Sequence, residues 1–171
     1  DEGNWTGMVS REDDLVCFAE GRIFFVYGQN PEPPDVNLQV RRCDRKKHGA
    51  IAPYSIVVDE KTGAIYYAAK DGIYALEGTT PKYISRLIEP DWKTINTAAL
   101  DKVACVIDDD RLWVAVPYGA AQTTNNRVYV FHLRKPWLPV TVFTGWAPSC
   151  FAKNFLTRQI YFGHATAAKV M

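Results

Sequence analysis

The sequence predicts an all-β protein built from antiparallel four-stranded meanders, and three observations support this prediction. First, 47% of the 171 residues are hydrophobic and 13% are aromatic, which is enough apolar surface for a sizeable core. Second, Ala64–Gly78 reads as two short strands joined at Asp71 and Gly72, and Asp-Gly between two apolar runs is a strong hairpin signal. Third, this hairpin recurs along the chain.

The hairpin at Ala64–Gly78 has a near-copy fifty positions earlier, at Leu15–Gly28. Fainter copies of its first strand occur at Arg111–Val116 and Gln159–Gly163, at spacings of forty-seven and forty-eight residues. A repeat of this length indicates stacked or radially arranged β-units. The aligned pairs that open the four strands are Leu15-Val16, Ile65-Tyr66, Leu112-Trp113 and Ile160-Tyr161.

Each aligned pair joins an aliphatic residue to a second apolar residue, which predicts a sheet that is covered on both faces. Blades of a β-propeller have this property, because each blade packs between two neighbours. We therefore expect residues 1–171 to be part of one β-propeller domain that is incomplete in this sequence. Its approximate units are residues 5–48, 49–97, 98–145 and 146–171, the last of them incomplete.

The first unit is expected to open with a strand within residues 1–10, ahead of the hairpin at Leu15–Gly28. Three prolines between Gln29 and Asp35 forbid both a helix and a central strand there, so this segment is predicted to be a surface loop. Val36–Val40 alternates apolar and polar residues and predicts a half-buried strand. A basic loop, Arg41–His48, follows it.

The second unit is predicted to hold four strands, near residues 55–58, 64–69, 73–77 and 82–87, with a turn at Asp59–Gly63 before the hairpin. The last of these strands comes from the segment Tyr83–Ile88. Glu89, Pro90 and Asp91 then favour the first turn of a short helix that runs to about Thr97. Trp92 and Ile95 are expected to point inward from it.

The third unit is predicted to contain strands at Leu100–Ile107 and Arg111–Val116, joined by a turn at Asp108–Asp110. Pro117–Asn126 is a polar tip loop in this interpretation, and Val128–Leu133 and Val140–Phe143 complete the unit. The fourth unit retains a strand at Gln159–Gly163, and Ala168–Met171 would begin its partner. The sequence starts at Asp1 and stops inside this unit, so we expect it to be an excerpt of a larger protein.

Composition excludes several classes of protein. The apolar content excludes disorder, and no run approaches the roughly 18 apolar residues of a membrane span. The net charge is only +1, so the chain as a whole is not drawn to nucleic acid or to an anionic membrane. The four cysteines show no zinc spacing, and we expect buried free thiols at Cys17, Cys43, Cys105 and Cys150.

One basic cluster could contact phosphates or an acidic partner surface. Its residues, our candidates for contact with a partner or with DNA, are Arg41, Arg42, Arg45, Lys46 and Lys47. A solvated loop between two strands explains the same composition. No aromatic residues are interleaved with the charges, unlike in a single-strand-binding platform.

The carboxylates at Asp108–Asp110 could hold a divalent cation. Aspartates are also preferred in tight turns, and consecutive side chains splay apart, so we interpret this segment as a turn. The three histidines, at positions 48, 132 and 164, share no pattern. Of the five tryptophans we expect at least four in the core or between blades, although an exposed one could stack on a sugar.

The sequence contains no GxSxG elbow, Walker A loop, dinucleotide fingerprint or HExxH motif. Nothing nominates a pair of catalytic carboxylates. We therefore expect a protein that is not an enzyme and that has no catalytic residues, cofactor or metal ion.

The order of the motifs resembles virion structural proteins of tailed bacteriophages. The series runs LVCFAEGRIFFVYG, GAIAPYSIVV, AIYYAAKDGIYALEG, YISRLIEPDW, RLWVAVP, NRVYVFHL and QIYFG, over Leu15–Gly163. This family comprises β-propeller proteins of the tail or neck, including the nozzle type of short-tailed phages. The chain departs from the pattern at His164–Met171, which is alanine-rich where the family tends to continue glycine-rich.

The resemblance implies a subunit of an oligomeric ring around the passage for DNA. Its partners would be copies of itself and other tail or neck proteins, with transient, non-specific contact with DNA and no membrane span. The implied location is the virion, after synthesis in the host cytoplasm. The resemblance brings no active-site residues.

Two alternatives stay open. Val58–Leu76 also looks like blades of calcium-dependent lactonase-type propellers, in which central carboxylates hold the ion, but matching carboxylates do not recur at equivalent repeat positions. The other alternative is a carbohydrate-binding propeller, for which exposed tryptophans would be the signature.

Overall fold

The computed structural model describes residues 3–11, 14–28, 37–43, 48–154, 156–167 and 169–171. It confirms the all-β class, because the chain forms four antiparallel sheets in sequence order. The first sheet contains β1 (Trp5–Arg11), β2 (Asp14–Ala19), β3 (Arg22–Tyr27) and β4 (Gln39–Arg42). The second contains β5 (Val57–Val58), β6 (Ile65–Ala69), β7 (Gly72–Glu77) and β8 (Thr80–Tyr83). The third contains β9 (Ala104–Asp108), β10 (Arg111–Val116), β11 (Arg127–His132) and β12 (Thr141–Thr144), and the fourth contains β13 (Pro148–Lys153) and β14 (Ile160–His164).

The two hairpins that the sequence repeat aligned have the same register. Leu15 pairs with Val26 in the first sheet, and fifty residues later Ile65 pairs with Leu76 in the second. Every other pair of β2 with β3 that has a counterpart in β6 and β7 keeps this shift. The repeat seen in the sequence is therefore a repeat of the backbone structure.

The sheets stack face to face, and the second sheet is covered on both sides. Alternate residues of β6 point to opposite faces, so Ile65, Tyr67 and Ala69 pack against the first sheet. Tyr66 and Ala68 pack against the third. All five residues of β6 are buried, which explains why the sequence shows a continuous apolar run instead of a clean alternation of apolar and polar residues.

The fourth sheet covers part of the third through aromatic side chains. Trp113, Phe143 and Trp146 lie nearly parallel, with ring centroids 5.0–6.4 Å apart. Trp146 also stacks on Phe162 of β14 at 5.6 Å. Phe151 of β13 completes this contact against the buried residues of β10 and β11.

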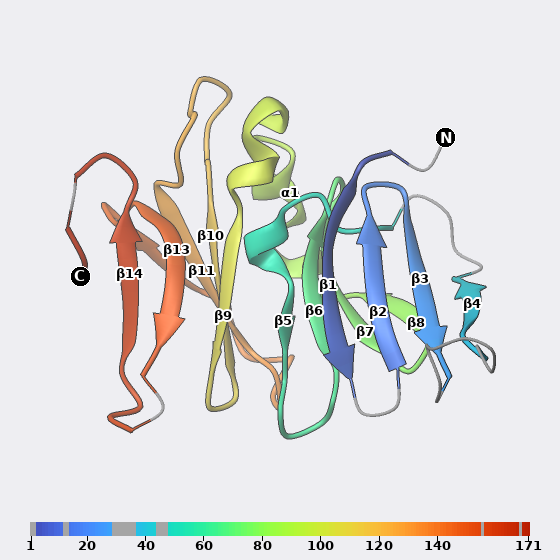
Figure 1. Cartoon of the computed structure of the whole chain (residues 1–171). Helices are drawn as coiled ribbons and strands as arrows, with labels where there is room; N and C mark the ends of the chain where they lie inside the picture. The colour runs from blue at the N-terminus through green and yellow to red at the C-terminus, as the bar shows by residue number, and fades with distance from the viewer. Residues whose placement is uncertain (1–2, 12–13, 29–36, 44–47, 155, 168) are drawn as a thin grey trace.

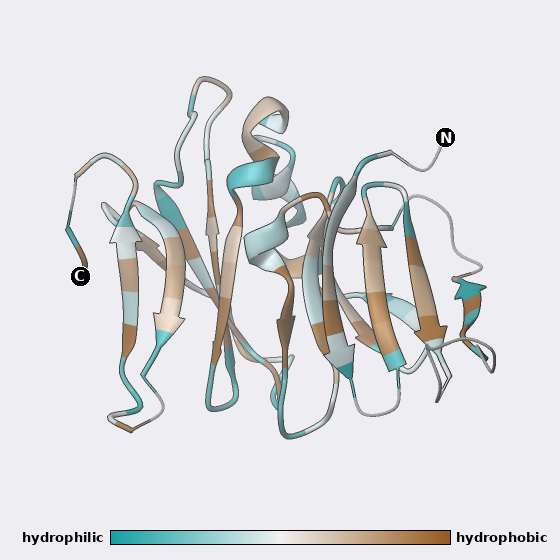
Figure 2. Cartoon of the chain, in the orientation of Figure 1, coloured by the Kyte–Doolittle hydropathy of each residue, from teal (hydrophilic) through white to brown (hydrophobic). Residues whose placement is uncertain are grey.

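Figure 1 shows the sheets following one another in chain order, from the first at the right of the view to the fourth at the left. The opening strands β5 and β9, and likewise β9 and β13, are in contact. Figure 2 shows hydrophobic stretches along the strands, while the turns at the lower end are more hydrophilic. No helix among the described residues is long and apolar enough to cross a membrane.

Two predicted strands of the second sheet are not present as predicted, because serine hydroxyls take over backbone hydrogen bonds. Ser55 lies in the 3-10 helix η1 (Pro53–Ser55), and its hydroxyl accepts from the amide of Ala68 at 2.9 Å. Ser85 accepts in the same way from the amide of Ile73 at 2.9 Å. A strand therefore remains only at β5 and β8, and the segment predicted as Tyr83–Ile88 ends in η2 (Arg86–Ile88).

The helical region is shorter than predicted. Helix α1 spans only Glu89–Trp92, although Trp92 and Ile95 are buried as expected. The start predicted for the next strand, at Leu100, lies instead in the 3-10 helix η3 (Thr97–Lys102), whose first turn is capped by the side chain of Asn96.

The predicted strand Val36–Val40 is displaced, and the structure places β4 at Gln39–Arg42. The proline-rich loop Gln29–Asp35 and residue Val36 lie outside the described residues. In the fourth unit, β14 and the tail approach each other as expected, with a bridge between Gly163 and Val170.

The four cysteines are free, but only Cys43 and Cys105 are buried. Cys17 is half-buried and Cys150 is exposed, so the expectation of four buried thiols is wrong for these two. The reason is their position on the first and fourth sheets, each of which has one face without a neighbouring sheet among the described residues.

Candidate functional site

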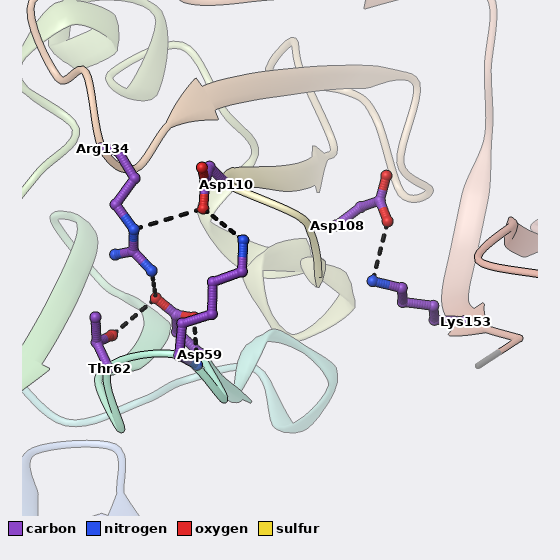
Figure 3. Close-up of polar contacts among 7 residues, drawn as sticks. Asp59, Thr62, Asp108, Asp110, Arg134 and Lys153 are labelled. Carbon is purple, nitrogen blue, oxygen red and sulfur yellow. Dashed lines mark hydrogen bonds and ion pairs between the residues drawn. The ribbon is translucent and has the colours of Figure 1, made fainter. Parts of the chain in front are cut away.

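Ion pairs and hydrogen bonds of charged residues from all four sheets occur at one end of the stack. This is the end at which β1 and β13 finish and at which the chain turns after β5 and β9, the lower end in Figure 1. We call this group of charged residues the inter-sheet charge network. It comprises Arg11, Asp14, Asp59, Lys61, Asp108, Asp110, Arg134 and Lys153. Figure 3 shows its part between the second, third and fourth sheets.

Asp59 lies in the turn that follows β5 and is only 1% exposed. The Arg134 guanidinium donates to its carboxylate at 2.7 Å, the Thr62 hydroxyl donates at 2.7 Å, and the amide of Lys61 donates at 3.1 Å. Burial alone would raise the pKa of Asp59. These three donors outweigh that effect and hold the pKa below its usual value, so the carboxylate is charged.

Arg134 and Lys61 carry the network from the second sheet to the third. Arg134 lies 3.5 Å from Asp110 as well as 2.7 Å from Asp59, and it therefore bridges two carboxylates. Lys61 donates to Asp110 at 2.9 Å. The hydrogen bond from Lys61 lowers the pKa of Asp110.

Charged residues at the same end also join the first sheet to the second and the third sheet to the fourth. Arg11, at the end of β1, binds Asp14 through two nitrogens, at 3.1 and 2.7 Å. It also donates at 2.7 Å to the carbonyl of Gly78, in the turn that joins β7 and β8 of the second sheet. Lys153, at the end of β13, lies 3.0 Å from Asp108 of the third sheet. Each pair of consecutive sheets is thus joined by charged groups at this end.

The predicted turn at Asp108–Asp110 is present, and its carboxylates do not converge. Asp108 turns to Lys153, whereas Asp110 turns to Lys61 and Arg134. Among the described residues no group of three or more histidine, cysteine or acidic side chains could hold a metal ion. The outer carboxylates of this turn act as ion-pair partners between sheets.

A cleft of about 540 Å³ opens beside the network, between β5 and β9. Its charged lining includes Asp59, Lys61, Asp109, Lys153 and Arg158. Asp109 and Arg158 have left-handed backbones, with φ of 50° and 55°. The lining carries both signs of charge in close alternation, so the cleft does not favour a ligand of one sign.

The structure separates the residues of the basic cluster. Arg41 and Arg42 belong to β4, opposite Phe25 and Phe24, so their side chains leave opposite faces of the sheet. This corrects the expectation of a loop at these two positions: pairing with β3 continues past Val40. The other candidates, Arg45, Lys46 and Lys47, lie outside the described residues.

Each described arginine of the cluster has a different environment. Arg42 lies over the ring of Phe24, 5.8 Å from its centroid. Arg41 lines a cleft of about 470 Å³ between the first and second sheets, together with Arg11 and Asp14. These two cations therefore do not form one patch.

The histidines lie apart, as expected from their lack of a shared pattern. His48 accepts a hydrogen bond from the hydroxyl of Tyr67 through its backbone carbonyl, at 2.7 Å, and burial raises the pKa of that tyrosine far above its usual range. His132 lies at the end of β11. His164 accepts from the amide of Ala167 at 3.2 Å.

A second polar cluster fixes α1 at the opposite end of the third sheet. The hydroxyl of Tyr129 donates to Asp91 at 2.7 Å, and Arg127 lies 3.2 Å from the same carboxylate. The Arg127 guanidinium also lies over the ring of Tyr118, 3.3 Å from its centroid. Burial raises the pKa of Tyr129, which stays a neutral donor.

The tryptophans pack less than expected. Trp92 is buried and Trp113 and Trp146 belong to the aromatic contact between sheets, but Trp5 and Trp137 are 67% and 75% exposed. The expectation of at least four packed tryptophans is therefore wrong. Trp5 packs on Phe24, on the face of the first sheet that has no neighbouring sheet among the described residues, and Trp137 lies in the loop between β11 and β12.

Comparisons with known proteins bear on the fold alone. No family model matches the chain, and no curated protein matches it. One similar solved structure is that of PorZ, described as an essential bacterial surface component of the type-IX secretion system of Porphyromonas gingivalis. The TM-score is 0.52 and the sequence identity is 12%, over 96% of this chain. The chain spans about a quarter of that structure, 26% of its length.

Proposed function

We propose that the chain is a structural, non-enzymatic part of the tail or neck of a tailed bacteriophage and forms an oligomeric ring around the DNA passage. The motif series over Leu15–Gly163 supports the phage assignment. The observation that carries the architectural role is the stack itself, in which apolar faces pack on each other and charged groups join the sheets at one end.

We also propose that the four sheets are blades of a β-propeller. The repeated hairpin register supports this arrangement, because equivalent strands occupy equivalent places in successive sheets. Contacts between the opening strands β5, β9 and β13 support it too, since such strands lie innermost in a propeller. In this arrangement the basic cluster at Arg41–Lys47 would contact an acidic partner or passing DNA.

The calcium-dependent alternative has less support. A calcium ion needs several converging oxygen ligands, and the outer carboxylates of the Asp108–Asp110 turn are engaged by basic side chains. We expect the melting temperature to be the same in calcium and in a chelator. A calcium-dependent rise would favour the lactonase-type reading.

A second candidate comes from PorZ, since the likeness to that cell-surface component extends over 96% of this chain. In that case the protein would be a bacterial surface component. The two candidates predict different locations, so location is the quantity to measure.

Phage particles purified on a density gradient, from the host in which the chain is produced, test the assignment. We expect peptides of the chain in the particle band by mass spectrometry, and density for a ring around the tail or neck channel by electron cryomicroscopy. Washed cells from an uninfected culture serve as the control. Absence of the chain from particles, together with its presence on those cells, would overturn the phage assignment in favour of a surface component.

A further inference from the structure

The outer face of the first sheet, the one turned away from the second sheet, is mostly apolar; its polar members include Ser10, which pairs with Leu15, and Arg42, which pairs with Phe24. Cross-strand pairing places Met8, Cys17 and Phe24 side by side on it, and likewise Leu15, Val26 and Val40. Met8 and Val40 are 70% and 65% exposed. Trp5 packs on Phe24 with a centroid distance of 4.9 Å, yet it is 67% exposed. Phe24 itself is only 5% exposed, and the exposed apolar surface is formed by Trp5, Met8 and Val40 above the half-buried centre of the face. Neighbouring exposed apolar side chains of this kind are typical of an interaction site.

The repeat shows what kind of surface this face fits. Shifted by fifty residues, Leu15, Cys17, Phe24 and Val26 correspond to Ile65, Tyr67, Tyr74 and Leu76 of the second sheet. Those four are at most 5% exposed, because the first sheet covers them. The outer face of the first sheet therefore has the composition and register of a face on which another sheet stacks.

The far face of the fourth sheet is the matching surface. Tyr161 and Gly163 occupy the repeat positions of Tyr66 and Ala68, which pack against the large side chains of the third sheet. Neither of them belongs to the contact with the third sheet. Their strand partners on this face, Ala152 and Cys150, are exposed. The far face of the fourth sheet thus presents Tyr161 beside three small residues, whereas the outer face of the first sheet presents mostly large side chains.

We propose that a second copy of this chain stacks the far face of its fourth sheet on the outer face of the first sheet, head to tail. The contact would repeat the pattern between the second and third sheets, where Ala68 and Ala75 face Tyr129 and Phe131. Head-to-tail contacts of this kind close into rings when the rotation per copy permits. The inference rests on the proposed architectural function and names the partner and surface for it.

Two native thiols make the contact testable. Cys17 lies on the outer face of the first sheet and Cys150 on the far face of the fourth, whereas Cys43 and Cys105 are buried. A short bis-maleimide, which adds one thiol to each of its two double bonds, should link Cys17 of one copy to Cys150 of the next. We expect covalent multimers on a denaturing gel and a Cys17–Cys150 peptide by mass spectrometry. Cys17→Ser and Cys150→Ser should each abolish them.

A charge on the face should dissociate the copies. We expect Met8→Glu to lower the mass measured by light scattering to that of one chain, because the side chain would be buried on stacking. Leu87→Glu is the matched control: Leu87 is 59% exposed in η2, away from both faces, so the mass should not change. Circular dichroism of both variants should match the wild type, since each site is exposed in the single chain.

A wild-type chain that stays monomeric, or links that join Cys17 to Cys17 or Cys150 to Cys150, would overturn the head-to-tail contact. This result is separate from the location test. A chain that is found in particles without the Cys17–Cys150 link would refute this contact and leave the structural role standing.

Discussion

At the scale of single residues, the contact between Asp59 and Arg134 is the one with the clearest energetic consequence. Asp59 is 1% exposed and takes its charge-neutralising hydrogen bond from Arg134 at 2.7 Å. Arg134→Ala would leave a buried carboxylate without its cation. We expect the free energy of unfolding to fall by about 2 kcal/mol, measured by urea denaturation.

Arg86→Ala is the control for this substitution. Arg86 is exposed in η2, so its removal should change the free energy of unfolding by less than about 0.5 kcal/mol. Equal losses in the two variants would show that Asp59 finds another partner when Arg134 is absent.

The pH dependence of stability follows from the same carboxylate. The pKa of Asp59 is lower in the folded protein than the usual aspartate value of about 3.9, so the folded state binds this proton less readily than the unfolded state does. The stabilisation is therefore present above about pH 4 and is lost as the pH falls through the folded pKa. Urea denaturation should be measured from about pH 2 to about pH 7. As the pH falls, the free energy of unfolding should decrease more steeply in the wild type than in Asp59→Asn. Parallel curves would contradict the assignment.

The sequence predicted the turn that holds Asp59 but not its partner. Asp59–Gly63 has strong turn composition, and Thr62 and Gly63 do donate back to Asp59. Arg134 lies 75 residues further along the chain, where nothing distinguishes it from a solvated arginine. Nothing in the sequence around Lys153 indicates its ion pair with Asp108, for the same reason. Ion pairs between sheets depend on three-dimensional packing and leave no local pattern.

At the scale of elements, the hydroxyl of Ser55 replaces a strand hydrogen bond. It is fully buried, accepts from the amide of Ala68 at 2.9 Å and donates to the carbonyl of Ala52 at 2.7 Å. Ser55→Ala would leave a buried amide unpaired, and we expect a loss of about 1–3 kcal/mol in unfolding free energy. Ser10→Ala, at an exposed position of β1, is the control and should be nearly neutral. A neutral Ser55→Ala would mean that water reaches the amide.

The link between the first and second sheets requires glycine at position 49. A β-carbon there would overlap the carbonyl oxygen of Ala19 and lie 2.6 Å from the amide nitrogen of Arg22. We expect Gly49→Ala to lower the unfolding free energy by about 2 kcal/mol or more, measured by thermal and chemical denaturation. Gly78→Ala meets no atom within 4 Å but has a φ of +62°, so it should lose about 1 kcal/mol from backbone strain alone. The reverse order would contradict the steric argument.

Strands with a counterpart in the sequence repeat were predicted well. Strands were predicted poorly where a polar side chain caps the backbone nearby. Arg111–Val116 matches β10 residue for residue, because a continuous apolar run leaves one interpretation. Tyr83–Ile88 looked like a strand, yet Ser85 turns the chain there by bonding to Ile73. Leu100 had the same ambiguity, since a short apolar run fits a helical turn equally well. Competition between a side chain and the backbone decided both cases.

At the scale of the whole molecule, the second sheet lies between two others and should open last. β6 and β7 are almost completely buried, whereas β4 is exposed at all four residues. Hydrogen exchange followed by mass spectrometry should give the slowest amides in β6 and β7 and the fastest strand amides in β4. The control is exchange in denaturant, where the segments should no longer differ. Equal protection of β4 and β6 in the native state would contradict the layered arrangement.

The stacking of the sheets was predictable from the sequence, but the side chains that remain exposed at the ends of the stack were not. Covered faces follow from the paired apolar residues at Ile65-Tyr66 and Leu112-Trp113, which the structure places on opposite faces of their sheets. The exposure of Trp5 and Trp137 was not predictable, since the same pattern describes a face with or without a neighbour. The basic cluster was predictable only as composition: its first two arginines proved to point apart.

The shared register of the hairpins at β2–β3 and β6–β7 has a cost during folding. Two hairpins with the same strand register and similar apolar faces can replace each other in a folding intermediate. Misassembly of this kind is a characteristic failure of repeat proteins. The apolar surfaces alone cannot tell the sheets apart. The ionic contacts can, because Asp59 finds its cation on the third sheet and Arg11 finds its acceptor on the second. These contacts form only when the sheets stack in their native order, so they favour correct assembly over an exchange of hairpins.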